Sequence, residues 1–149
     1  GIELGGIMKN IAVIGSGLIG RAWSIVFVKA KFKVYLYDLD PVALTKAYED
    51  IKSSLNDLKT HKLISEEPSV LLSRITLAKS IEHAVSNAEY VQENTSEDLE
   101  IKNDVKNPWE AVVNLVDMHP PKNEDDEKAR MRALLTYMKG SPTGPGIPQ

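Results

Sequence analysis

The sequence predicts an α/β fold: a doubly wound parallel sheet, cut short, with helices on its faces and a C-terminal helix after it. Three observations lead to this prediction. Short apolar runs alternate with helical patterns over the first two-thirds of the chain. A glycine-rich turn, GSGLIG, links the first run to the first helical pattern, and the second run ends on an acid. Strands that alternate with helices pair in parallel, because each helix returns the chain to the same edge of the sheet.

The first elements have the order of a dinucleotide-binding unit. A strand is expected over Ile11–Ile14, a helix over Arg21–Ala30 and a second strand over Val34–Tyr37. Between the first strand and the helix lies a G-x-G-x-x-G turn, which consists of Gly15, Ser16, Gly17, Leu18, Ile19 and Gly20. This order of strand, glycine motif, helix and strand predicts a Rossmann-type sheet with a nucleotide at its carboxyl edge.

Each glycine of the motif has a predicted physical role. Gly15 allows the tight turn out of the strand, Gly17 lets a pyrophosphate approach the backbone, and Gly20 lets the helix pack closely on the sheet. The N–H groups at the start of the helix then face the phosphate charge. We therefore predict that all six residues of the turn bind the cofactor.

Asp38 is the predicted contact to the sugar of the nucleotide. It follows Gly20 by eighteen residues, near the spacing at which an acid accepts hydrogen bonds from the adenosine ribose hydroxyls. Because the carboxylate would repel a 2′-phosphate, the sequence favours NAD over NADP. A glycine turn without a ligand is the alternative, but it leaves Asp38 unexplained.

Helices and strands continue to alternate after Asp38. Asp40 and Pro41 are expected to start a long helix that reaches Lys59. The elements predicted next are a connector over Leu63–Ser73 with a short helix after Pro68, a strand over Arg74–Ala78, a short helix over Ser80–Ser86 capped by Ser80, and a strand over Glu89–Asn94.

The last third of the chain holds one clear helical pattern and two weaker ones. A helix is expected from Glu97 to about Val105, while the run Trp109–Met118 fits either strand or helix. Asn123 is predicted to cap a helix over Glu124–Lys139, with an apolar stripe of Met131, Leu134, Leu135 and Met138. We expect residues 1–8 to be a leader or tag remnant, 9–118 a dinucleotide-binding domain, 119–140 a linker and helix, and 141–149 a flexible tail.

Composition narrows the classes of function. The 149 residues are 42% hydrophobic and 26% charged, which suits one globular domain with a real core. The net charge of −3 argues against binding to nucleic acid or to an anionic membrane. The absence of cysteine rules out disulfides, a thiol nucleophile and Cys-ligated zinc, and it fits a reducing, cytoplasmic location. We predict no metal site and no membrane span.

From Lys9 to about Val105 the chain resembles the NAD-binding domain of the 3-hydroxyacyl-CoA dehydrogenase family, in particular its lambda-crystallin or L-gulonate 3-dehydrogenase branch. The stretches that carry the resemblance are IAVIGSGLIGRAW, VYLYDLDP and AEYVQENTSEDLEIKNDV. The resemblance implies hydride transfer to NAD from the secondary 3-hydroxyl of a small hydroxy acid or acyl-CoA, and a homo-oligomer. It places Glu97 and Lys102 among the NAD contacts near the nicotinamide, although the pair could also be ordinary charged helix residues. It also implies, with weaker support, that Ser54 contacts the coenzyme A of an acyl-CoA substrate.

The second half departs from the family pattern. Asp104 stands where the resemblance implies the catalytic histidine of an H-x-x-N-P motif, and Asp117 replaces the glutamate that would orient it. The serine-rich segment expected between Val105 and Asn107 is absent, as if a few dozen residues were deleted. Of the remaining histidines, His119 lies in a proline turn and His83 in a short helix without an evident partner. The catalytic residues are therefore unknown, and we expect this chain to lack the full catalytic machinery.

Two alternatives remain open. One is a dinucleotide-binding protein without catalysis, with a structural or crystallin-like role. The other is a different Rossmann class, such as an FAD or nucleotide-sugar enzyme.

Overall fold

The computed structural model of the protein describes residues 9–94 and 122–140. The chain divides into two compact units, Gly1–Asn94 and Thr95–Gln149. The first unit contains a sheet with its helices, and the described part of the second is a single helix. The predicted elements over Glu97–Val105 and Trp109–Met118 lie outside the described residues.

The described strands form one parallel sheet in the order β3-β2-β1-β4. Its central strands are β1 (Asn10–Ile14) and β2 (Lys33–Tyr37), and its outer strands are β3 (Ile75–Leu77) and β4 (Tyr90–Glu93). The chain steps outward from β1 to β3 and then returns to place β4 on the other side of β1. This crossover confirms the predicted Rossmann-type topology, in which ligands bind where the strand order reverses.

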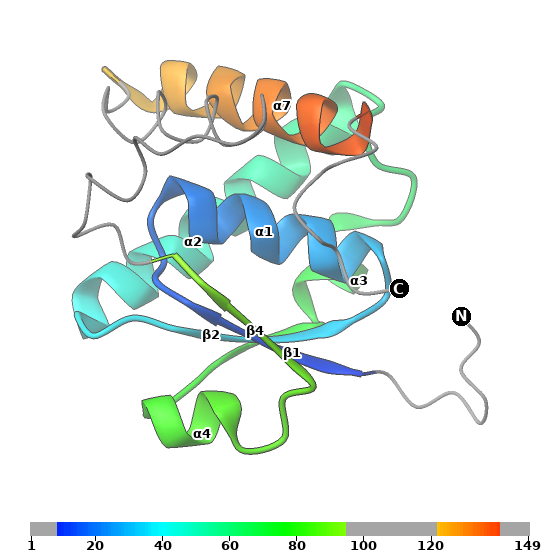
Figure 1. Ribbon diagram of the computed structural model, residues 1–149. Coiled ribbons are helices and arrows are strands. Elements are labelled where there is room, and N and C mark those ends of the chain that lie inside the picture. Colours follow the sequence, from blue (N-terminus) through cyan, green and yellow to red (C-terminus); the bar gives the residue numbers. More distant parts are fainter. Residues whose placement is uncertain (1–8, 95–121, 141–149) are drawn as a thin grey trace. The chain divides into compact units, whose positions relative to one another are not determined.

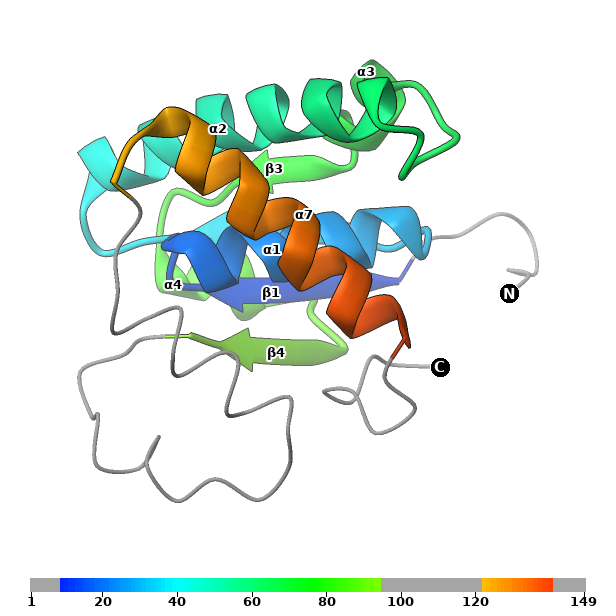
Figure 2. The same ribbon diagram turned by 90° about the horizontal axis from the view of Figure 1, so that it is seen from above.

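Helices cover both faces of this sheet. The helices α1 (Leu18–Lys29) and α2 (Pro41–Thr60) lie on one face, and the short helix α4 (Ile81–Val85) lies on the other (Figure 1). Seen from above, α1 runs along β1 and α2 lies beside it (Figure 2). On the α1 side, Phe27 stacks on Trp23 with ring centroids 5.1 Å apart and meets the ring edge of Tyr90 at 6.2 Å. Both Trp23 and Phe27 are fully buried and anchor α1 to the sheet.

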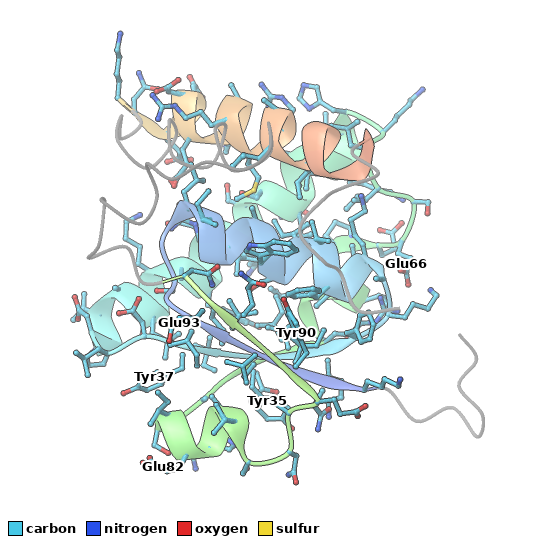
Figure 3. The ribbon with its side chains drawn as sticks, in the orientation of Figure 1. Tyr35, Tyr37, Glu66, Glu82, Tyr90 and Glu93 are labelled. Atoms are coloured by element: carbon cyan, nitrogen blue, oxygen red, sulfur yellow. The ribbon has the colours of Figure 1, made fainter. Side chains whose placement is uncertain are left out.

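The α4 side has a smaller core. Three of its four buried members are alanines, which lets the short helix α4 lie close to the strands; the members are Ala12, Ile14, Ala78 and Ala84. Tyr35 and Tyr37 of β2 pack against this cluster and remain partly exposed (Figure 3). The alternation along β2 thus sends its tyrosines to the α4 side and Val34 and Leu36 to the other face, where they are fully buried.

The helix α1 begins at Leu18, three residues before the expected start at Arg21. Half of the glycine motif, from Leu18 to Gly20, is therefore helical instead of forming a turn. Glycine disfavours a helix interior, and this propensity explains the late start that the sequence suggests. Close packing of Gly20 on the preceding strand outweighs that propensity.

Predicted helix starts are confirmed by their capping bonds. The Val42 N–H donates to Asp40 Oδ1 over 3.0 Å at the start of α2, where Pro41 is the first helical residue. The His83 N–H donates to Ser80 Oγ over 3.0 Å at the start of α4. The short helix after Pro68 is also present as α3 (Pro68–Leu72). These bonds are local, so the sequence alone identifies them.

Two helices end at a lysine in the left-handed backbone region. Lys31 follows α1 with φ 73° and Lys62 follows α2 with φ 59°. In each case the next N–H closes a bond to the carbonyl five residues earlier: Phe32 to Phe27 over 3.0 Å and Leu63 to Leu58 over 2.9 Å. This is the Schellman arrangement, whose left-handed position favours glycine.

Arg74 joins three segments at the edge of the sheet opposite the glycine motif. Its Nη1 donates to the Val28 carbonyl over 2.7 Å, and its Nη2 donates to Glu66 Oε1 over 2.7 Å. Lys31 also approaches Glu66, with Nζ 3.5 Å from Oε2. The Arg74 hydrogen bond, which outweighs partial burial, holds the pKa of Glu66 below its usual value.

The second unit contains α7 (Glu124–Gly140), which matches the helix predicted over Glu124–Lys139 and extends one residue further. The predicted cap is confirmed, because the Asp126 N–H donates to Asn123 Oδ1 over 2.8 Å. Acids fill the first turn, where they interact favourably with the helix dipole. Of the predicted stripe, Met131, Leu134 and Leu135 are buried.

Candidate functional site

The glycine turn, Asp38 and Asn94 come together at the carboxyl ends of three neighbouring strands. The Gly15 N–H donates to the Tyr37 carbonyl over 2.8 Å, which ties the turn after β1 to the end of β2. The Asn94 N–H donates to the Ile14 carbonyl over 2.8 Å, which ties the end of β4 to the same turn. Backbone bonds therefore bring together three loops that are far apart in sequence.

Only glycine fits at two positions of the turn. Gly15 has φ +98°, a conformation that other residues rarely adopt, and a Cβ there would lie 3.2 Å from the Asn94 carbonyl carbon. A Cβ at Gly20 would lie 1.9 Å from the Gly15 carbonyl oxygen. The backbone of α1 thus contacts the backbone of the turn directly, as predicted for Gly20.

Gly17 is different, because its surroundings are open. A Cβ built there meets no described atom within 4 Å. Gly17 is the N-cap of α1, and among the described residues no side chain caps this helix. The first turn also contains no acid. The N–H groups at the start of α1 therefore face a space that can hold an anion, and the positive end of the helix dipole favours one.

Asp38 points back at the glycine turn and is held by three donors. Its Oδ2 accepts from the Ser16 N–H over 2.9 Å and from the Ser16 hydroxyl over 2.7 Å. Its Oδ1 accepts from the Asp40 N–H over 2.9 Å. Partial burial opposes the charged form, but the bonds from Asp40 and Ser16 together outweigh it and lower the pKa of Asp38. The carboxylate is therefore charged at neutral pH.

Two further side chains support the turn, and the sequence assigns neither of them a partner. Arg21 on α1 is buried, and its Nη1 donates to the Ser16 carbonyl over 3.1 Å. The Asn94 side-chain amide donates to the Ile14 carbonyl over 3.2 Å and lies beside Gly20. In the sequence, Arg21 follows the glycine motif and Asn94 ends a predicted strand. Neither position indicates a hydrogen-bond partner until the fold is known.

A comparison with protein families identifies this arrangement. The family described as 3-hydroxyacyl-CoA dehydrogenase, NAD binding domain, matches residues 10–117, which is most of the chain. The chain belongs to the 3-hydroxyacyl-CoA dehydrogenase family. The resemblance noted from the glycine motif is confirmed, and so is NAD as the cofactor of this domain.

Proteins of similar sequence and structure support this family assignment. The chain is 32% identical over 110 residues to lambda-crystallin of Oryctolagus cuniculus, covering 70% of this chain and 33% of that protein. It is 38% identical over 96 residues to 3-hydroxyadipyl-CoA dehydrogenase of Escherichia coli K12, covering 64% of this chain and 20% of that protein. The crystal structure of 3-hydroxybutyryl-CoA dehydrogenase from the same organism is 32% identical with a TM-score of 0.55, covering 78% and 23%. The chain thus spans a third or less of the length of these relatives.

The structural features of the dehydrogenase domain fit NAD at the turn, because the open space beside Gly17 and the uncapped start of α1 suit a diphosphate. Two predicted contacts, Glu97 and Lys102, lie outside the described residues, and so do Asp104, Asp117 and His119. Ser54 is buried within α2. These residues stay predictions.

The described histidines are engaged in local contacts. His83 Nδ1 accepts from the Lys79 N–H over 3.0 Å, and its ring lies edge-on to Tyr35 at 5.6 Å. His61 lies at the exposed end of α2 beside Asp57. Within residues 9–94 and 122–140, no helix is long and apolar enough to cross a membrane, and no cluster of three acids or histidines could hold a metal ion.

Proposed function

We propose that residues Gly15–Gly20 hold the diphosphate of NAD at the start of α1, and that Asp38 accepts a hydrogen bond from the adenosine ribose. The observation that carries this proposal is the open space at Gly17, bounded by the uncapped helix start. Asp38 stands at the next strand end, tied to the same turn, and its charge disfavours a 2′-phosphate. Glu97 and Lys102 would contact the nicotinamide side.

Titration with NAD(H) by calorimetry or NADH fluorescence tests the assignment of the diphosphate. The Gly17→Val variant places a branched side chain in the open space, so NAD affinity should fall by at least roughly tenfold. Val42→Ala is the matched control, because Val42 is 76% exposed on α2 and a change there should leave the fold unchanged. Equal NAD affinity of Gly17→Val and the wild-type chain would refute the assignment.

We further propose that the domain serves an enzyme that oxidises the secondary 3-hydroxyl of a hydroxy acid or acyl-CoA. Support comes from the family and from the activity named for relatives such as 3-hydroxyadipyl-CoA dehydrogenase of E. coli. The sequence contains no recognisable histidine–glutamate pair, so this chain alone should bind NAD without turnover. An absence of cysteine is consistent with the cytoplasm.

A second candidate function is dinucleotide binding without catalysis, which the likeness to lambda-crystallin favours. A chimera separates the two candidates. Residues 9–105 would replace the matching domain of E. coli 3-hydroxyadipyl-CoA dehydrogenase, and NADH formation would be followed by absorbance. Turnover by the chimera would support the enzyme reading, whereas NAD binding without turnover would favour the non-catalytic one.

A further inference from the structure

We propose that Ser16 is a positioning residue for nucleotide selection, which holds the Asp38 carboxylate so that one oxygen faces the ribose and a 2′-phosphate is rejected. This inference rests on the proposed NAD site. It refines the prediction that Ser16 binds the cofactor, because it assigns the Ser16 hydroxyl to Asp38.

The contacts of Ser16 carry the inference. Ser16 is only 3% exposed, and it donates both its hydroxyl and its N–H to the same oxygen, Asp38 Oδ2, over 2.7 and 2.9 Å. Two donors fill the hydrogen-bonding capacity of one carboxylate oxygen. The hydroxyl proton is thus committed to Asp38 and is not available to a phosphate.

The second oxygen of Asp38 has room for a ligand. From the residues that the structure describes, Oδ1 accepts one bond, donated by the Asp40 N–H over 2.9 Å, and a carboxylate oxygen accepts about two. Donors on both sides prevent the carboxylate from rotating. Asp38 is also partly exposed, so a ribose hydroxyl can reach its remaining site.

Ser16 is itself held in place by a side chain of α1. The buried guanidinium of Arg21 donates to the Ser16 carbonyl over 3.1 Å, so the serine is held between α1 and Asp38. Among the described residues, the charges that hydrogen bonds place around Ser16 and Asp38 are those of Arg21, of Asp40 and of the positive end of α1. Removal of the Ser16 hydroxyl leaves all three in place, which allows its effect to be measured alone.

A double-mutant cycle tests whether Ser16 acts through Asp38. Ser16→Ala should weaken NAD binding roughly fivefold, since it removes one hydrogen bond to the carboxylate, and should narrow the preference for NAD over NADP. In the Asp38→Ala background the same change should cost no further affinity. Ser16→Thr, which keeps the hydroxyl, should restore the preference. An equal loss of affinity in both backgrounds would mean that Ser16 touches the cofactor directly, and would overturn the inference.

A second readout needs no nucleotide. An NMR titration of the Asp38 side-chain carboxyl carbon should show a higher pKa in Ser16→Ala than in the wild-type chain, because the substitution removes the hydroxyl that donates to Asp38 Oδ2 while the Ser16 N–H remains. Ser24→Ala is the control: this buried serine of α1 donates to the Gly20 carbonyl over 2.8 Å and should leave the Asp38 pKa unchanged. An unchanged pKa in Ser16→Ala would overturn the inference while leaving the NAD site intact. Failure of the wild-type chain to bind NAD would overturn the proposed site and the selection role with it.

Discussion

At the scale of single residues, Gly17 and Gly20 stand three positions apart but have opposite surroundings. A Cβ at Gly20 would overlap the Gly15 carbonyl oxygen at 1.9 Å, while one at Gly17 would meet open space among the described atoms. The sequence motif gives both residues the same letter. The motif nevertheless predicts different roles for the two residues, and the close contact of Gly20 with the Gly15 backbone confirms the packing role, while the described atoms leave open space beside Gly17.

Alanine substitutions should separate these two roles. Gly20→Ala should lower the free energy of unfolding by ~1–3 kcal/mol, because backbone atoms must shift to admit the methyl group. Gly17→Ala, with φ −69° and open space, should change it by no more than ~0.5 kcal/mol. Urea denaturation measures both values. A Gly20→Ala protein as stable as Gly17→Ala would show that the contact between α1 and the turn relaxes freely.

Asp38 should decide the choice of cofactor. Asp38→Ala removes an acceptor for the ribose and should weaken NAD binding by ~1–3 kcal/mol. Because the charge that repels a 2′-phosphate also disappears, NADP should bind better than it does to the wild-type chain. Parallel calorimetric titrations with NAD and NADP measure both effects. If the substitution left both the NAD affinity and the NADP affinity unchanged, Asp38 would be excluded as the ribose contact.

The same residues show what sequence reasoning could reach. The spacing from Gly20 to Asp38 indicated an acid at the site, and the structure places that acid beside the turn. The bonds between Ser16 and Asp38 join residues 22 positions apart, so only the parallel pairing of β1 and β2 creates them. Arg21 read as an ordinary helix residue, since nothing local indicates that its guanidinium is buried under Ser16.

At the scale of elements, polar residues indicated the starts of α2, α4 and α7, whereas the start of α1 lies three residues before the predicted one. Ser80 and Asn123 cap helices as expected, and Asp40 caps the helix that it was expected to start, because a capping bond spans two or three residues. The ends at Lys31 and Lys62 carried no glycine or proline signal. Their left-handed conformation depends on where the following apolar residue packs, as Phe32 does against Phe27.

Glycine at Lys62 should therefore stabilise the protein. Lys62→Gly relieves a left-handed conformation at the end of α2 and should raise the free energy of unfolding by ~0.5–1 kcal/mol. The matched control, Lys52→Gly, places glycine inside the same helix and should lower it by ~1 kcal/mol. Thermal melts of both variants measure the difference. A decrease for Lys62→Gly comparable to the control would contradict the interpretation of this helix end.

At the scale of the whole first unit, Arg74 links α1, the connector before α3 and the start of β3 through one guanidinium. Its side chain is 11% exposed, unlike that of Lys46, which pairs with Asp50 within α2 and is 71% exposed. Shielded, bidentate hydrogen bonds to a carboxylate contribute more than solvated ion pairs. The parallel sheet was predictable from the alternation of elements, but this tertiary link was not.

Arg74→Ala should lower the free energy of unfolding at neutral pH by ~1.5–3 kcal/mol, whereas Lys46→Ala should change it by no more than ~0.5 kcal/mol.

The pH dependence of the free energy of unfolding should change as well. Because the Arg74 hydrogen bond lowers the pKa of Glu66, the wild-type chain gains stability above the unfolded value of 4.5 and loses it as the pH falls through the lower native value. In Arg74→Ala, the free energy of unfolding should fall less steeply as the pH is lowered. Denaturation between about pH 3 and 7 measures it, and an unchanged slope would contradict the role of Arg74.

The position of β4 has a consequence for biosynthesis. The strand that braces the glycine turn through Asn94 is the last of the described sheet to be translated, about eighty residues after the turn itself. While β4 is still inside the ribosomal exit tunnel, the nascent chain therefore has a glycine turn without the bond from Asn94. If NAD binds at this turn as proposed, the complete binding site forms only after β4 has left the tunnel and paired with β1.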